Sequence, residues 1–328
     1  MKVRSFRNTD LEAVCDVWQQ HFVAEGADSG LDMEPIWLES FALAKPSFES
    51  DQFLIAESEE GGMKGFLHFS FQSDADGADL DEASVSIEAL CILPAEDEGL
   101  VAKELIENCF GRSPSAKRRV ARPKILEGCH YLGVGPCNGL IGITPQETRA
   151  SCWLTQAGFQ IGQPNMLWEL DLAWFQPPVD RAIIQTRRAT QVVRNEDEPN
   201  LNWHQACCMG HTEMTEFQLL GRQRILNETA VRARLLFWQL PTELAQHEQL
   251  VAWLCPLEIN DSGSKSFPYS SAEEEWLHLF SESARQLQAE GFDWIRVATN
   301  AAEESTVTLL HRLGFAPCGT GASFTRQG

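Results

Sequence analysis

The sequence predicts two consecutive copies of one α/β unit, and three observations support this fold class. Residues 294–315 form a β-branched run that closes on Asn300, then a short helix, then a Leu-Gly-Phe turn before a last strand. The same order appears more loosely before Gly158-Phe159. The chain has 328 residues, whereas one domain usually takes about 150.

Composition favours a folded protein outside the membrane. Hydrophobic residues make up 43% of the chain, which is ample for buried cores. No apolar run approaches the roughly 18 residues of a membrane helix, and the first residues do not resemble a signal peptide. We therefore expect a soluble, cytoplasmic protein. The pair Cys207-Cys208, between His204 and His211, suggests either capping and packing or a redox or metal site.

The net charge of −21 predicts a surface that repels nucleic acid and anionic membranes. One basic island stands apart, and its members are Arg112, Lys117, Arg118, Arg119, Arg122 and Lys124. A solvated loop or helix end is one interpretation of the island. The other is a site for a phosphate-bearing ligand.

In the first copy, local signals predict strands and helices in a fixed order. Thr9-Asp-Leu-Glu12 has capping-box spacing, and Gly61-Gly62 separates two runs that predict a hairpin. We also expect a strand at 3–7, a helix after 34, a buried strand Ser84–Leu93 before Pro94, a helix Leu100–Phe110, a strand Leu126–Gly135, a helix from Thr144 to Ala157 and a strand Met166–Leu172.

The second copy repeats much of this order. We expect a strand near Arg188–Arg194, helical segments Trp203–Met209 and Glu213–Gly221, strands Val231–Leu240 and Gln249–Ile259, a helix from Ser271 to Gly291, and the strand, helix and strand that begin at Trp294. The Pro-Pro pair at 177–178 favours a linker. The predicted domains are therefore 1–175 and 185–328, joined by a linker at 176–184.

This order of elements, given twice, resembles tandem members of the GNAT (N-acetyltransferase) superfamily. The motif positions are Pro94 after the fourth strand, Gly158-Phe159, Asn300 after the fifth strand of the second copy, and Leu313-Gly314-Phe315. In element order the resemblance covers nearly the whole chain. It implies that each domain is a mixed, mostly antiparallel twisted sheet flanked by helices, and that the acyl-CoA motifs are degenerate.

The resemblance also implies a reaction, which is acyl transfer from acetyl-CoA or another acyl-CoA to an amine of a small molecule or peptide. In the family the fourth and fifth strands part, and the helix after the fourth strand offers amide N–H groups to the pyrophosphate. A side-chain base and an acid complete the site. We expect acetyl-CoA as co-substrate and neither nucleic acid nor membrane as a partner.

Two residues are the expected catalytic groups. Glu88 lies in the fourth strand of the first copy, where family members commonly have a base. A carboxylate among apolar neighbours faces a cleft, is paired when buried, or lies on an exposed face of the strand. The family's usual acid, a Tyr in the last helix, is replaced by Leu154 and Leu310. Tyr131, beside His130 on the expected fifth strand, is the candidate substitute.

Cofactor binding is expected through the backbone after the fourth strand and through the strand-end Asn. The residues are Ile92, Gly99, Leu100, Val101, Ala102 and Asn300. Asp97 stands where the family has a cation or an amide, and a carboxylate beside a pyrophosphate weakens binding. An acidic first turn also suits an ordinary helix. The corresponding helix of the second copy opens with three Glu residues, so the first copy is the expected cofactor site.

Two functions from different classes remain open. The first is an acyl-CoA-dependent N-acyltransferase, which accounts for the fold and for Pro94. The second is a non-catalytic tandem GNAT-like protein for binding or scaffolding, which accounts for the acidic loops and the missing tyrosines. We prefer the first, because backbone N–H groups hold a pyrophosphate without help from side chains.

Overall fold

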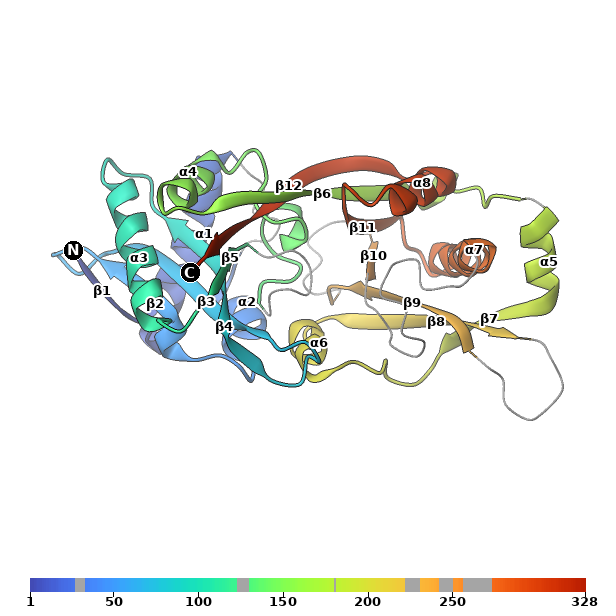
Figure 1. The fold of residues 1–328 in the computed structure, drawn as a ribbon, viewed down its shortest axis with the longest axis horizontal. Coiled ribbons are helices and arrows are strands. Elements are labelled where there is room, and N and C mark those ends of the chain that lie inside the picture. Colours follow the sequence, from blue (N-terminus) through green and yellow to red (C-terminus); the bar gives the residue numbers. More distant parts are fainter. Residues whose placement is uncertain (27–32, 123–129, 180, 222–230, 242–249, 256–272) are drawn as a thin grey trace. The chain divides into compact units, whose positions relative to one another are not determined.

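Two compact α/β units make up the chain (Figure 1). The computed structural model describes residues 1–26, 33–122, 130–179, 181–221, 231–241, 250–255 and 273–328. Unit 1 contains Met1–Asn165, Asn202–His211 and Gly319–Gly328, and unit 2 contains Met166–Leu201 and Thr212–Cys318. Most neighbouring strands are antiparallel, and helices flank them. The predicted mixed α/β fold class is confirmed.

Unit 1 is built on a sheet in the order β1-β2-β3-β4-β5-β12, in which only the β4–β5 pair is parallel. Its strands are β1 (Lys2–Ser5), β2 (Phe53–Glu57), β3 (Met63–Ser73), β4 (Leu80–Ile92), β5 (Arg118–Ala121) and the ends of β6 (Gln160–Asp171) and β12 (Ala316–Gln327) that belong to this unit. Its α-helices are α1 (Leu11–Glu25), α2 (Pro35–Leu38), α3 (Glu98–Arg112), α4 (Thr148–Gln156) and α6 (Trp203–Met209).

The two faces of the unit 1 sheet differ in chemistry. Leu67, Phe69, Ile87 and alternate residues of the neighbouring strands form an apolar core with α3 and α4. Because successive strand residues point to opposite faces, His68 and Ser70 lie on the other face of the sheet. The helix α1 packs against β3 and β4. Polar residues therefore have a place inside unit 1 without disturbing its apolar core.

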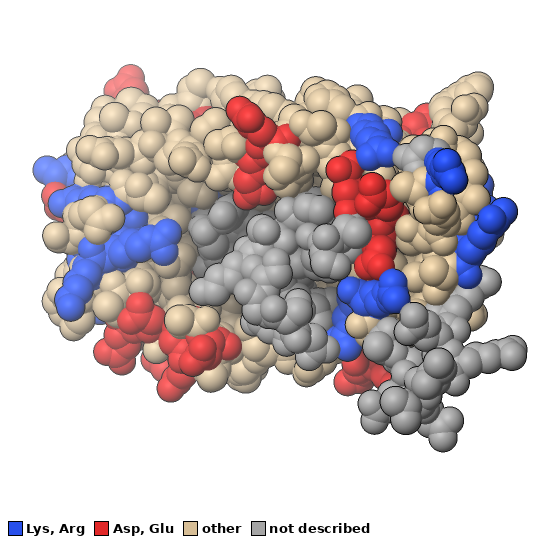
Figure 2. All heavy atoms as spheres, turned by 45° about the vertical axis from the view of Figure 1, so that its right-hand side comes forward, with Lys and Arg blue, Asp and Glu red and all other residues tan. Residues whose placement is uncertain are grey.

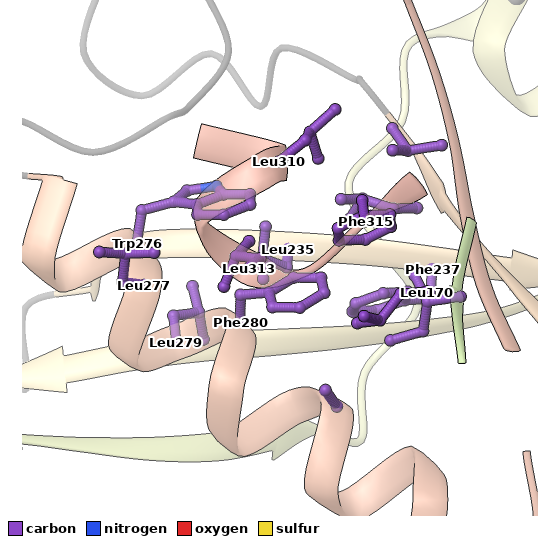
Figure 3. Close-up of a cluster of buried hydrophobic side chains, with 14 of the residues drawn as sticks. Leu170, Leu235, Phe237, Trp276, Leu277, Leu279, Phe280, Leu310, Leu313 and Phe315 are labelled. Carbon is purple, nitrogen blue, oxygen red and sulfur yellow. The ribbon is translucent and has the colours of Figure 1, made fainter. Parts of the chain in front are cut away.

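In unit 2 the strands follow in the order β6-β11-β10-β9-β8-β7, with β10 and β11 parallel. Its strands are β7 (Thr190–Asn195), β8 (Glu213–Gly221), β9 (Val231–Gln239), β10 (Val251–Cys255) and β11 (Trp294–Asn300), and its helices are α5 (Arg181–Ala189), α7 (Glu273–Ala289) and α8 (Glu304–Leu313). Figure 3 shows Trp276 and Phe280 of α7 packed with Leu313 of α8 and Leu235 of β9. This cluster buries one face of α7.

The same helix ending occurs in both units and explains the repeated Gly-Phe pair. Gly158 and Gly314 have φ angles of 84° and 88°, which glycine adopts at least cost. The amide of Phe159 then donates to the Leu154 carbonyl at 3.0 Å, and that of Phe315 to the Leu310 carbonyl at 3.0 Å. The sequence motif is therefore a helix cap in both copies.

Packing divides the chain differently from the predicted domains 1–175 and 185–328. Residues 166–175 belong to unit 2, whereas 202–211 and 319–328 belong to unit 1. The segment 202–211 is held in unit 1 by Lys45, whose Nζ donates to the Cys207 and Cys208 carbonyls at 2.6 and 3.2 Å. A sequence boundary follows chain order, but these contacts join segments far apart in the chain.

Three local predictions were wrong. Glu213–Gly221 is strand β8 and not a helix, because pairing with β7 and β9 overrides an ambiguous pattern of apolar residues. The predicted strand Leu126–Gly135 forms no strand over 130–135, and β5 lies in the basic island instead; residues 126–129 lie outside the described residues. The predicted helix from Thr144 begins at Thr148, since the Thr144–Glu147 pair closes one turn earlier.

We predict that Gly142→Ala destabilises unit 1 by about 3 kcal/mol. Gly142 has a φ of 86°, and an added Cβ would lie 2.5 Å from the Ala322 carbonyl, beside the Ile143–Ala322 bridge. Gly26→Ala is the matched control, because its φ is 65° but nothing lies within 4 Å of the added Cβ. Urea unfolding followed by circular dichroism measures both losses. Equal losses would show that the close approach of the backbones contributes nothing.

Candidate functional site

The strands β4 and β5 separate part-way along β4. They pair in parallel only from Ser84 opposite Arg118 to Ile87 opposite Ala121. The amide of Arg122 makes one further bond, to the Ile87 carbonyl at 2.8 Å. Within the described residues, β4 beyond Ile87 is paired on one side only, by β3. Among the described residues, one edge of β4 therefore has no strand partner at 88–92.

Glu88 is the extra residue of a β-bulge at this separation. In the β3–β4 register, His68 lies opposite Ala89 and Phe69 opposite Ile87, so that Glu88 has no opposite residue. A bulge bends the strand and redirects a side chain. The Glu88 side chain is buried and accepts a hydrogen bond from Ser70 Oγ at 2.7 Å. The alternative of an exposed strand face is therefore wrong, and the carboxylate is both buried and paired.

Tyr131 and several histidines lie on the same side of the sheet as Glu88. We call the set His68, Ser70, Ser86, Glu88, His130 and Tyr131 the polar layer; all six are buried. The Tyr131 hydroxyl lies 3.1 Å from His68 Nδ1. Burial, with the Cys91 thiol and Glu88 nearby, holds the pKa of Tyr131 well above its usual value. The hydroxyl therefore stays protonated at neutral pH.

The structure corrects the local context of Tyr131. The residue lies outside any strand and has a φ of 62°, which is uncommon for a non-glycine residue. Its ring stacks on Trp18 of α1, with ring centroids 5.2 Å apart. His68 and Ser86 were missed by the sequence analysis. The alternation of side chains between the two faces of β3 and β4 could have identified them, since both are polar residues on buried strands.

Ile92 is fully buried, and its carbonyl is already engaged. Arg149 at the start of α4 donates to it from Nη2 at 3.1 Å and to Glu98 from Nη2 at 2.7 Å. Glu25 accepts from the Arg149 and Ala150 amides at 3.2 and 3.1 Å and so caps α4. The sequence analysis missed this network, because its members come from α1, α3 and α4.

The first turn of α3 supplies only part of the expected amide donors. The Leu100 and Val101 amides both donate to the Asp97 carbonyl, at 3.0 and 3.1 Å. Gly99 and Ala102 line a groove of about 490 Å³ between α3 and α4, together with Lys103 and Trp153 and with Arg326 of β12. Of the predicted cofactor residues, these two therefore face a groove.

Asp97 pairs with Lys64, an interaction that the sequence analysis did not foresee. The hydrogen bond from Lys64 lowers the pKa of the Asp97 carboxyl below its usual value. Lys64 begins β3 and thus lies far from Asp97 in the chain. The pair offsets one of the negative charges that the loop would otherwise present.

Asn300 belongs to unit 2, unlike the other predicted cofactor residues. It ends β11, and its side-chain Oδ1 accepts a hydrogen bond from the Ala302 amide at 2.9 Å. This geometry is that of an Asx turn. Glu258, the second-copy counterpart of Glu88, lies outside the described residues.

The basic island contributes arginines that already have protein partners. Arg112 donates to Ser5 and Asp51, Arg118 to Gln72 and Arg119 to Ser113, and Arg122 pairs with Glu147. Lys124 lies outside the described residues. Figure 2 shows both Lys and Arg side chains and Asp and Glu side chains on the face that it draws. No helix of the described chain is both long enough and apolar enough to span a membrane.

The segment around Cys207-Cys208 serves as packing and capping. His204 Nδ1 lies 3.7 Å from Cys208 Sγ on the same helix, and Lys45 caps the helix end. His211 Nε2 lies 2.8 Å from the Leu132 carbonyl. Among the residues that the structure describes, no group of three or more His, Cys, Asp or Glu side chains could hold a metal ion.

Comparison with solved structures identifies the architecture. The chain matches a glucosamine N-acetyltransferase region of a fungal multi-domain GH3 β-N-acetylglucosaminidase with a TM-score of 0.65 at 12% identity, covering 99% of this chain and 38% of that one. It matches a tandem GNAT protein of the clavulanic acid biosynthesis pathway with a TM-score of 0.60 at 12% identity, covering 99% and 98%. The chain has the tandem GNAT fold.

A third similar structure extends the range of acyl groups found on this architecture. Saccharomyces cerevisiae N-myristoyltransferase with bound myristoyl-CoA matches with a TM-score of 0.53 at 11% identity, covering 99% of this chain and 80% of that one. No family model and no curated protein sequence matches this tandem GNAT-fold chain. The likeness is therefore one of fold, at identities too low to transfer a substrate.

We predict that unit 1 loses stability as the pH falls from about 6.5 to about 3. Burial lowers the pKa values of His21 and His68 to about 3, so the unfolded chain binds more protons than the folded one in this window. Each histidine then contributes a slope of up to about 1.4 kcal/mol per pH unit. Urea unfolding at several pH values measures the slope. His21→Asn should reduce it, whereas His311→Asn, at an exposed position in unit 2, should not.

Proposed function

We propose that this chain is an acyl-CoA-dependent N-acyltransferase whose working centre lies in unit 1. The observation that supports this best is that β4 separates from β5 after Ile87, next to the bulge that carries the buried Glu88. An extended pantetheine arm can pair with the open edge of β4 as an added strand. The tandem GNAT fold also supports an acyltransferase, with acetyl-CoA as the proposed co-substrate.

In the proposed reaction two residues each transfer one proton, one as a base and the other as an acid. The acceptor amine attacks the thioester carbonyl carbon, a C–N bond forms, and the C–S bond breaks. Glu88 takes the proton that the amine loses, and the Tyr131 hydroxyl gives a proton to the departing CoA thiolate. Burial keeps the Tyr131 hydroxyl protonated at neutral pH, so it carries the proton that this step needs. The acceptor is an amine of a small molecule or a peptide.

Binding of the pyrophosphate would rest on α3 and on two nearby cations. The helix N-terminus carries a partial positive charge. Lys64 and Arg149 are each paired with a carboxylate of this loop, Asp97 and Glu98 respectively. A phosphate group can compete with these carboxylates for the two cations. The loop is therefore close to neutral, rather than as acidic as its sequence suggests.

One observation favours the alternative, a non-catalytic tandem GNAT-like binding or scaffold protein. Arg149 donates to the Ile92 carbonyl, where a pantetheine amide would bind. In a working enzyme this guanidinium has to move when acyl-CoA binds. In a scaffold it would be a permanent part of the core. Titration with acetyl-CoA separates the two functions.

We predict that the chain binds acetyl-CoA and that Glu88→Gln lowers kcat by at least about 100-fold without weakening acetyl-CoA binding, because the amide cannot accept the proton. Calorimetry measures binding, and release of free thiol with a panel of amines measures turnover. Glu12→Gln, on the exposed side of α1, is the control. A dissociation constant weaker than about 1 mM, near −4 kcal/mol, would rule out the enzyme.

We also predict that Asp97→Arg tightens acetyl-CoA binding by about tenfold, since it removes a carboxylate and releases Lys64. The change acts at the pyrophosphate, so its effect should shrink as salt is added. Glu12→Arg makes the same change in charge on α1. If both variants tighten binding equally, the gain comes from net charge, and the ligand does not pass the loop that contains Asp97.

A further inference from the structure

The polar layer of unit 1 contains hydrogen-bonding atoms that have no partner among the described residues. His130 is 6% exposed, and neither of its ring nitrogens has a partner among the described residues. The same holds for His68 Nε2 and Ser86 Oγ, whose residues are fully buried. Buried polar groups are nearly always bonded in native proteins, and each unmade bond costs about 1–3 kcal/mol. Four such atoms in one layer therefore call for a polar partner from outside the described residues.

These atoms lie close to one another and to Glu88. Ser86 lies opposite Ser70 in the β3–β4 register, and Ser70 Oγ donates to the Glu88 carboxylate at 2.7 Å. The rings of His68 and His130 have centroids 4.4 Å apart, at 66° to each other. The Tyr131 hydroxyl fixes one side of His68, so that Nε2 is the nitrogen left over.

The chemistry of the layer is that of neutral hydrogen-bonding groups. Burial lowers the pKa of His68 to about 3 and that of His130 well below its usual value, so both rings are neutral at pH 7. A neutral imidazole has one donor and one acceptor, as does a hydroxyl. An anionic ligand would meet the Glu88 carboxylate, and the nearby cation, Lys45, already donates to the Cys207 and Cys208 carbonyls. The layer therefore suits hydroxyl groups and not phosphate.

Aromatic rings surround the polar atoms. Phe53 stacks on His68 with centroids 4.9 Å apart, and Phe48 meets the same ring edge-on at 5.8 Å. Trp18 stacks on Tyr131 at 5.2 Å. These contacts fix the orientation of the His68 and Tyr131 rings within the layer.

We infer that the polar layer binds the acceptor substrate, and that this acceptor is a small primary amine that carries hydroxyl groups, with the amine at Glu88 and the hydroxyls at His130, His68 and Ser86. The identification of the occupant as the acceptor rests on the proposed acyl transfer. The binding of a hydroxylated amine does not, and it can be measured without acyl-CoA.

Two amines of similar ring size test this inference. Glucosamine carries hydroxyl groups around its ring, and cyclohexylamine has none. Calorimetry on the full chain should give a dissociation constant for glucosamine at least about tenfold lower, since a buried bond of 1.4 kcal/mol is worth that factor. His130→Leu should remove most of this preference and leave the affinity for cyclohexylamine within about twofold.

Two control variants separate a loss of binding from a loss of folding. His130→Asn retains a donor and an acceptor and should bind glucosamine with intermediate affinity, even if His130→Leu fails to fold. His311→Leu, on α8, should bind like the unaltered chain. Equal affinity for the two amines, or an unchanged preference in His130→Leu, overturns the inference and means that water completes the layer. A separate acetyl-CoA titration that shows no binding overturns the acyltransferase instead and leaves the amine result standing.

Discussion

The short parallel pairing of β4 with β5 is the constraint on which the rest of unit 1 depends. Because the described pairing ends at Ile87, the backbone groups on that edge of β4 need a partner other than β5 as far as the structure describes it. The bulge at Glu88 lies next to the end of this pairing. It takes the Glu88 side chain out of the regular alternation of side chains between the two faces of the strand. The end of this pairing and the bulge therefore bring an open strand edge and a buried acid together within the described residues.

The charged side chains around the open edge are already engaged in hydrogen bonds and ion pairs within the protein. Arg149 bonds Glu98 and the Ile92 carbonyl, while Glu25 caps the helix to which Arg149 belongs. Removing charges from water is costly, and pairing recovers that cost only when the geometry is good. The set can therefore be stable without a ligand. A ligand at Ile92 must offer the backbone a bond at least as favourable as the one Arg149 makes.

The sequence predicted the fold well where local signals and tertiary packing agree. The stretch from Trp294 to Phe315 forms the expected strand, helix and capped turn, because β-branched residues and a left-handed Gly specify these structures locally. It failed at Glu213–Gly221, where the apolar pattern suits helix and strand alike and only the neighbouring strands decide. It also failed at Tyr131, since irregular backbone with a positive φ leaves no periodic signal.

Only part of the candidate site could be predicted from the sequence. Glu88, Gly99 and Ala102 were predicted through the resemblance to the GNAT superfamily, in which the fourth strand commonly carries a base and the loop after it holds the pyrophosphate. The Lys64–Asp97 pair, the Arg149 network and the unsatisfied imidazoles were not found, because their members are far apart in the chain. Taken alone, the sequence determined the repeated α/β order and the helix caps, which depend on neighbours along the chain. Only the tertiary structure decided which charges are paired and which polar atoms lack a partner, because burial and partner distance exist only once distant segments have packed.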